Sequence, residues 1–161
     1  MTAQPEFANL ESAGRALAGL LSAEQEAQPL LIAVVPNGVP VALGIAAELH
    51  WPVVGLRVRR DAAGVAPLEV PVVRGRHVYV VDDGVESGSV ARAVAAPLRA
   101  AGAASVVLAV PACSHGRALE LHDRYDDVVA VRLHAGDRDL CTFYENFDTI
   151  SESVAEQLLA N

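Results

Sequence analysis

The segment that most constrains the fold is residues 78–93, VYVVDDGVESGSVARA. A β-branched apolar run ends abruptly at two acids and a glycine, which predicts a buried strand followed by a loop. Residues 90–99 have helical composition and contain no glycine, so a helix is expected next. Between strand and helix lies the small, hydroxyl-rich sequence Glu86-Ser87-Gly88-Ser89. The segment therefore predicts one strand, loop and helix unit of an α/β fold.

The predicted loop has the composition of a phosphate site. The first turn of a helix has no internal partners for its N–H groups and carries the positive end of the helix dipole. Residues 86–89 can therefore turn several backbone N–H groups towards one point. Asp82 and Asp83, close by, favour a ligand that also offers ribose hydroxyls or a magnesium ion. A ribose 5′-phosphate has both features.

Strand and helix patterns alternate along the rest of the chain. Apolar runs predict strands at 30–35, 53–59, 77–81, 105–110 and 127–133, with a further short β segment considered at 68–73. Helical patterns cover 7–26, 39–50, 89–101 and 114–125, the last with Ser114 as N-cap. The alternation predicts a single doubly wound domain over 1–161 with a mainly parallel, about five-stranded sheet. It includes an N-terminal helical segment, 1–28, and a C-terminal tail helix within 143–161.

Polar loops follow several of these strands. In doubly wound sheets, ligands bind beyond the carboxyl ends of the strands. Asn37, Arg60, residues 82–89 and residues 111–114 are all expected at those ends. The topology thus predicts that four separated loops converge on one site.

The sequence resembles the type I phosphoribosyltransferases. Its VVDDGVESGS is similar to the family's motif for phosphoribosyl pyrophosphate (PRPP), and residues 36–42, PNGVPVA, resemble the pyrophosphate loop. Residues 143–147, FYENF, followed by Ser151 and an amphipathic tail, resemble the ending of a bacterial subgroup of predicted phosphoribosyltransferases. The resemblance covers about residues 30–161.

This resemblance implies transfer of the ribose 5-phosphate of PRPP, bound with Mg²⁺, to a nitrogenous acceptor with release of pyrophosphate. The implied roles of the residues fall into three groups. Ribose hydroxyls and Mg²⁺ would meet Asp82 and Asp83; the 5′-phosphate would meet Gly84, Glu86, Ser87, Gly88 and Ser89; pyrophosphate would meet Asn37, Gly38 and Arg60. Glu86 and Asp83 are the candidate catalytic residues, with Glu86 as a general base or an orienting group.

Two departures from the family pattern leave a second function open. Asn37 stands where the subgroup has arginine, and the connection over residues 61–76 is shorter than the hood or flexible loop of active relatives. Both features would suit a non-catalytic protein that binds PRPP or a nucleotide phosphate, and a scaffold with a vestigial site is a third possibility. Each motif also has a plain structural alternative: an acidic turn at Asp82 and Asp83, an N-cap cluster at 87–89, and a surface arginine at position 60.

Composition excludes several functions. The net charge of −8 argues against a general nucleic-acid or membrane-surface binder. The chain contains no lysine, which excludes a Walker-type phosphate loop and a Schiff-base mechanism. No dedicated metal ligands at zinc spacing are found, and no stretch approaches the roughly 20 apolar residues of a transmembrane helix. We expect a cytoplasmic protein, and the resemblance adds a homodimer. Tyr144 and Phe147 are expected to anchor the tail rather than to stack on an acceptor.

Overall fold

The computed structural model describes residues 4–21 and 27–161. Its helices are α1 (Leu10–Leu21), α2 (Gly38–Leu49), α3 (Ser89–Ala100), α4 (His115–Leu121), α5 (Glu152–Ala160) and the 3₁₀ helix η1 (Leu140–Phe143). Its strands are β1 (Pro29–Val34), β2 (Val53–Leu56), β3 (Val58–Asp61), β4 (Gly64–Pro67), β5 (His77–Val81), β6 (Ser105–Ser114) and β7 (Asp127–His134). None of the helices in these ranges is both long enough and apolar enough to cross a bilayer.

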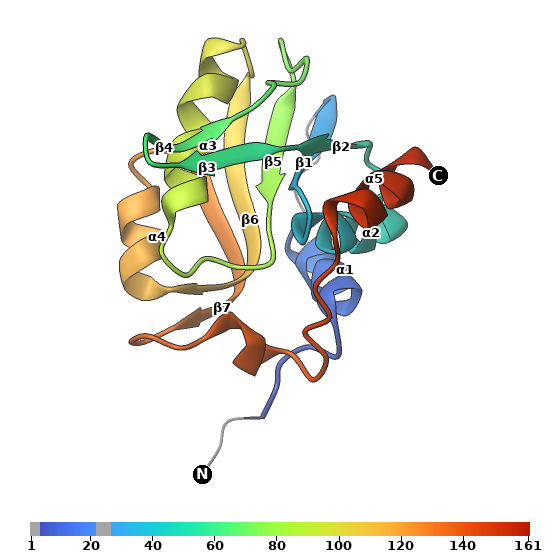
Figure 1. Ribbon diagram of the computed structural model, residues 1–161, viewed down its shortest axis with the longest axis vertical. Helices are drawn as coiled ribbons and strands as arrows, with labels where there is room; N and C mark the ends of the chain where they lie inside the picture. Colours follow the sequence, from blue (N-terminus) through green and yellow to red (C-terminus); the bar gives the residue numbers. More distant parts are fainter. Residues whose placement is uncertain (1–3, 22–26) are drawn as a thin grey trace.

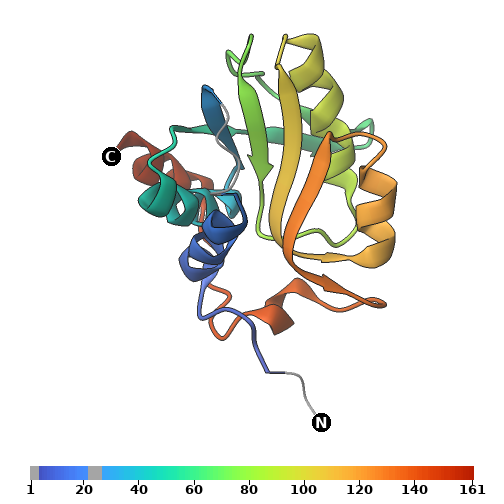
Figure 2. The same ribbon diagram turned by 180° about the vertical axis from the view of Figure 1, so that it is seen from behind.

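A five-stranded parallel sheet forms the centre of the molecule, as predicted (Figure 1). Its strand order is β2-β1-β5-β6-β7, and every neighbouring pair is parallel. Helices α1, α2 and α5 cover one face, and α3 and α4 cover the other (Figures 1 and 2). Because both faces are covered, β1 and β5 are almost continuously apolar and buried.

The pleat of the strands divides the core into two clusters. Leu31 and Tyr79 pack with α1 and α2, whereas their neighbours Ile32 and Val80 pack with α3. This division follows because successive side chains of a strand point to opposite faces of the sheet. The apolar runs without alternation therefore belong to strands that are buried on both faces of the sheet.

The predicted strand at 53–59 was wrong in its second half. The main-sheet strand ends at Leu56, which pairs with Val34, the last residue of β1. Beyond that point β1 offers no further partner, so the chain leaves the sheet and forms β3, which pairs antiparallel with β4 in a separate hairpin. Residues 68–73 do not form the short β segment that their sequence allows.

Boundaries of three further elements differ from the sequence prediction. Strand β6 runs to Ser114 instead of residue 110, because residues 112–114 continue to pair with β7. Helix α4 consequently begins at His115 and ends at Leu121, with Ser114 as its N-cap as predicted. Helix α1 begins at Leu10 rather than residue 7, and the predicted continuation over 22–26 lies outside the described residues.

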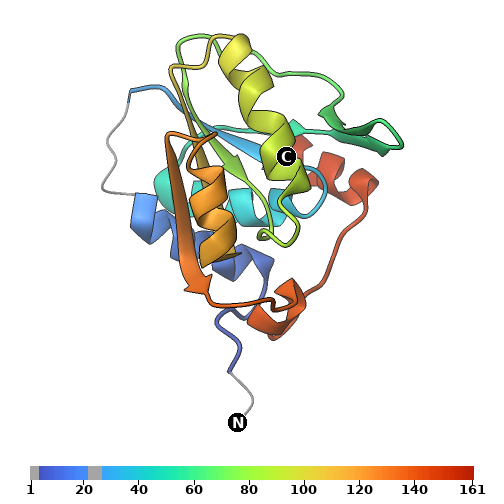
Figure 3. The same cartoon turned by 90° about the vertical axis from the view of Figure 1, so that its left-hand side faces the viewer.

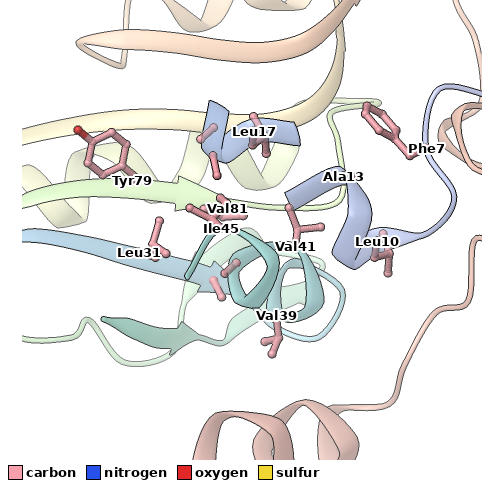
Figure 4. Packing of buried hydrophobic residues seen from close by; sticks show 14 of the residues in the cluster. Phe7, Leu10, Ala13, Leu17, Leu31, Val39, Val41, Ile45, Tyr79 and Val81 are labelled. Atoms are coloured by element: carbon pink, nitrogen blue, oxygen red, sulfur yellow. The ribbon is translucent and has the colours of Figure 1, made fainter. Parts of the chain in front are cut away.

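Helices α1 and α2 approach each other closely through two glycines. A Cβ atom built on Gly14 would collide with the carbonyl oxygen of Val41, and one on Gly44 would collide with the carbonyl oxygen of Glu11. Leu17, Val41 and their neighbours fill the surrounding core (Figure 4). The small residues thus set the position of α2, whose N-terminus faces the carboxyl end of the sheet.

We expect Gly44→Ala to lower the free energy of unfolding by about 1–3 kcal/mol, because the added methyl group meets backbone that cannot move aside. Gly19→Ala is the matched control, since a Cβ atom there meets nothing within 4 Å among the residues that the structure describes. The control should gain up to about 1 kcal/mol from helix propensity. Urea unfolding measures both changes, and a Gly44→Ala protein as stable as wild type would contradict the packing.

Candidate functional site

A cavity of about 430 Å³ lies at the carboxyl ends of the central strands. It brings together Asn37, Arg60 and residues 82–89, which come from three separate segments of the chain. Its other lining side chains are apolar and come mainly from strands and helix α3: Val34, Val65, Val80, Val90, Ala91, Leu108 and Leu140. Residues 111–114 were also expected here, but none of them lines this cavity.

Two adjacent carboxyl groups form one wall of the cavity. The backbone N–H of Asp83 donates to Asp82 Oδ1 at 2.8 Å, which fixes the turn at the end of β5. Burial and the neighbouring Asp83 charge raise the pKa of Asp82 well above its ordinary value, and burial likewise raises the pKa of Asp83. Arg60 opposes both shifts electrostatically. Two crowded acids of this kind are suited to bind hydroxyl groups or a cation.

The loop that follows is built around a glycine in the left-handed region. Gly88 has φ 82° and is the N-cap of α3, where it offers no side chain to the first helical turn. The hydroxyl groups of Ser87 and Ser89 lie 2.9 Å apart, and Ser89 N–H donates to Ser87 Oγ at 3.3 Å. The loop therefore presents hydroxyls and the positive end of a helix to the same cavity.

Contacts from β6 and α4 hold this loop in place. Val85 N–H donates to the carbonyl of Ala112 at 3.0 Å, and Arg117 Nε donates to the carbonyl of Glu86 at 3.2 Å. Arg117 also pairs with Glu120 at 3.2 Å. Sequence reasoning missed the part that Arg117 plays, because this residue lies 31 positions from Glu86 and belongs to no recognisable motif.

The segment after β7 is attached to the same loop. Glu86 Oε1 accepts a hydrogen bond from Leu140 N–H at 2.9 Å, and Tyr144 donates its hydroxyl to the carbonyl of Asp83 at 2.7 Å. A Cβ atom at Gly84, which has φ 147°, would collide with the Leu140 side chain. Tyr144 is buried, which raises the pKa of its hydroxyl, and it serves as the anchor that was expected.

A second cavity, of about 200 Å³, lies on the other side of Glu86. Val85 and Glu86 line both cavities. The rest of the lining comes from the end of β6 and from the segment that begins at the end of β7: Ser114, His134, Gly136, Asp137, Arg138 and Asp139. Both ring nitrogens of His134 are buried, and neither makes a hydrogen bond within the described part of the chain.

The arginine of this second cavity is already engaged. Arg138 lies over the Phe143 ring at 3.9 Å, and it donates to the hydroxyl of Thr142 at 2.7 Å and to the Thr142 carbonyl at 3.0 Å. Asp137 and Asp139 make no ion pair within residues 4–21 and 27–161. The lining therefore offers mainly hydrogen-bond acceptors.

Asn37 and Gly38 form the third loop of the site. Asn37 Oδ1 accepts a hydrogen bond from Ile150 N–H at 3.0 Å. Gly38 does not itself line the cavity, but a Cβ atom there would lie 2.5 Å from the Val81 carbonyl oxygen. Glycine is therefore required for the loop to lie against the end of β5.

A metal ion would need help from its ligand to bind here. Over the described ranges, no group of three or more His, Cys, Asp or Glu side chains is arranged to hold a metal. Asp82 and Asp83 provide two crowded carboxyl groups, which fit a Mg²⁺ ion that a phosphorylated ligand completes.

Together these features define a class of site. A loop of small residues at a helix N-terminus, two acids at the end of the preceding strand and an arginine in the same cavity are groups suited to bind a phosphorylated sugar. The comparisons identify the family. The model of the phosphoribosyl transferase domain matches residues 6–137, which is most of the chain. The chain therefore belongs to the phosphoribosyl transferase domain family, as the motif predicted.

Solved structures share the fold. The structure of TT1426 from Thermus thermophilus is 22% identical, with coverage of 96% of this chain and 97% of that one and a TM-score of 0.85. A hypothetical protein from Neisseria gonorrhoeae with bound ppGpp is 16% identical, with coverage of 99% and 97% and a TM-score of 0.64. A purine phosphoribosyltransferase from Pyrococcus horikoshii is 19% identical, with coverage of 82% and 90% and a TM-score of 0.61.

Proposed function

We propose that this protein is a phosphoribosyltransferase that binds PRPP in the first cavity and an acceptor in the second. The observation that carries the proposal is that Asp82, Asp83 and the loop of residues 86–89 line a single cavity together with Arg60 and Asn37. Membership of the phosphoribosyl transferase domain family supports a transferase over the non-catalytic alternative.

Each part of PRPP has a matching wall in the first cavity. The N-terminus of α3 and the hydroxyls of Ser87 and Ser89 would bind the 5′-phosphate. The carboxyl groups of Asp82 and Asp83 would accept hydrogen bonds from the ribose hydroxyls. Arg60, on the β3–β4 hairpin, would face the pyrophosphate and lower the cost of the charge that builds on it.

A Mg²⁺ ion bound with PRPP would supply further neutralisation of the departing pyrophosphate. In this chain Asp82 and Asp83 are the residues that would hold it, jointly with the ligand. Ligand binding should keep both carboxyl groups ionised, although burial in the free protein raises their pKa values.

In the proposed reaction, a lone pair on the acceptor nitrogen forms a bond to C1 of the ribose, and the C1–O bond to pyrophosphate breaks with its electrons. The acceptor loses one proton. Glu86 lies between the two cavities and is the residue that we propose takes this proton or orients the acceptor. Because Oε1 of Glu86 already accepts from Leu140 N–H, the proton would go to Oε2.

The second cavity supports a particular kind of acceptor. Its volume of about 200 Å³ suits a small ring, and it shares Glu86 with the first cavity. Glu86, Asp137 and Asp139 supply carboxylate oxygens, whereas Arg138 is held against Phe143 and Thr142. This lining favours an acceptor with N–H donors and disfavours a carboxylated ring.

A pyrophosphate-release assay tests the proposal. The protein, PRPP and Mg²⁺ are incubated with a panel of rings that carry N–H donors and a matched panel that carries carboxylates. Release with the first panel alone is the expected result, and no release with any ring would contradict a transferase. The proposal also includes a cytoplasmic location and a homodimer, and a monomeric mass in light scattering would contradict the dimer.

A further inference from the structure

We infer that the C-terminal tail, residues 148–161, positions the leaving-group side of the site through a tie between Asn37 and Ile150. The inference rests on the proposed function, because it assigns Asn37 a role towards pyrophosphate. Asn37 is the residue at which the chain departs from the family pattern. Its contacts give that departure a physical reason.

Asn37 immediately precedes α2 and lines the first cavity. Asparagine in this position commonly caps its own helix, but here the side chain makes no cap hydrogen bond to α2. The side-chain oxygen Oδ1 of Asn37 instead accepts a hydrogen bond from Ile150 N–H, 113 residues further along the chain. The side chain therefore connects the loop to the tail.

The tail is itself firmly seated. Ser151 caps α5 by accepting from Val154 N–H at 3.1 Å, and Ala155 is fully buried. A Cβ atom at Gly55 would lie only 2.7 Å from the Leu159 side chain, so α5 packs directly on β2. Figure 1 shows α5 beside α2 at that edge of the sheet. Ile150, just before the cap, is thus held at a defined place.

The loop is enclosed on its other side by the sheet. Gly38 lies so close to β5 that a Cβ atom would meet the Val81 carbonyl oxygen at 2.5 Å and the Asp82 Cα atom at 3.2 Å. The loop that carries Asn37 therefore lies between the end of β5 and the tail. Loss of the hydrogen bond to Ile150 would leave the loop in contact with the end of β5 but no longer held by the tail.

This arrangement explains why asparagine and not arginine stands at position 37. Arginine has five donors and no acceptor, so it would leave Ile150 N–H without its partner. Asparagine accepts that bond through its oxygen and keeps an amide N–H₂ group for the cavity. The positive charge in the lining of the cavity then comes from Arg60. Asn37 is a positioning residue, and Arg60 carries the charge.

Ile150→Pro tests the tie because it removes the N–H donor without a change in the loop. The matched control is Thr149→Pro, one residue earlier, where the N–H makes no hydrogen bond within the described residues. Asn37→Leu, of similar shape, removes the acceptor together with the amide N–H₂ group and serves if Ile150→Pro does not fold. Calorimetry measures the binding of two probes to each protein, Mg²⁺ with pyrophosphate and ribose 5-phosphate alone.

We expect Ile150→Pro and Asn37→Leu to weaken pyrophosphate binding about three- to tenfold and to leave ribose 5-phosphate binding unchanged. The KM for PRPP should rise by the same factor, with a smaller change in kcat. Equal weakening of both probes, or unchanged pyrophosphate binding, would overturn the inference. Wild-type protein that binds neither probe would instead overturn the proposed function.

Discussion

Replacement of both Asp82 and Asp83 by asparagine is expected to reduce PRPP turnover at least about 100-fold while it stabilises the free protein at pH 8. The loss follows because the amides cannot hold a cation or bind ribose hydroxyls as strongly as carboxylates do. The gain follows because burial disfavours the ionised carboxyl groups, whose pKa values are raised. Asparagine retains an oxygen that can accept from the residue 83 N–H, so the turn should survive.

The pH dependence of this gain has a definite sign. An aspartate in the unfolded chain ionises near pH 3.9, whereas these two ionise at higher pH in the folded protein. Their favourable contribution to stability is therefore full below the unfolded pKa and is lost as the pH rises through the folded pKa. The midpoint of the double variant should equal that of wild type at low pH and exceed it at pH 8. The difference should be about 2–4 °C for each kcal/mol of relieved desolvation.

Thermal unfolding from pH 3 to pH 8 measures this difference. Asp123→Asn, at an exposed position, is the control and should change neither stability nor turnover. A double variant that is less stable than wild type at pH 8 would show that the two acids are structural. Unchanged turnover would exclude them from the site.

The second large effect is expected at Gly88. Gly88→Val forces a β-branched residue to φ 82°, which costs about 1–3 kcal/mol, and it displaces the loop that would bind the 5′-phosphate. We expect the rise in melting temperature with PRPP and Mg²⁺ to disappear in this variant. Differential scanning fluorimetry measures the rise.

Gly75→Val separates strain from ligand binding. Gly75 has φ 74°, and a Cβ atom there meets nothing within 4 Å in the described part of the chain, so the backbone strain is matched while the site is untouched. This control should lose similar stability and keep the full response to PRPP. If both variants respond to PRPP as wild type does, the loop at 86–89 is not the phosphate site.

Local sequence patterns were enough to predict the central strands and the alternation of strands and helices along the chain. An apolar run that ends at Asp82 and Asp83 and leads into Ser87-Gly88-Ser89 carries its own chemistry, because strand, turn and helix start are all encoded within about 16 residues. The topology of parallel sheets then predicted that Asn37 and Arg60 would lie near this loop, and both line the same cavity.

Contacts between distant residues were not predictable in this way. The strand expected at 53–59 ends early because β1 ends, a fact that depends on pairing and not on the composition of residues 57–59. This break creates the β3–β4 hairpin (Figure 3). Arg60 and Val65 of the hairpin line the cavity. Three contacts to the site loops come from residues 54, 61 and 113 positions away in the sequence, namely Leu140, Tyr144 and Ile150. The composition of this segment does not indicate which of its residues will meet which residue of the loops.

The connection after β2 is shorter than the hood of active relatives, yet part of it reaches the first cavity. Residues 58–67 form a hairpin, and it reaches the first cavity through Arg60 and Val65. The segment from His134 to Tyr144 closes the other side through its bonds to Asp83 and Glu86. This chain therefore contributes lining residues to both sides of the candidate site.

The thermal stability of the wild-type protein with PRPP tests the central claim most directly. The melting temperature is measured with PRPP and Mg²⁺, with PRPP and EDTA, and with Mg²⁺ alone. Ligand at 100 times its Kd stabilises the folded state by about 2.7 kcal/mol, so a clear rise is predicted for PRPP with Mg²⁺ and a smaller one with EDTA. No rise at millimolar PRPP in the presence of Mg²⁺ would contradict the assignment of the first cavity to PRPP.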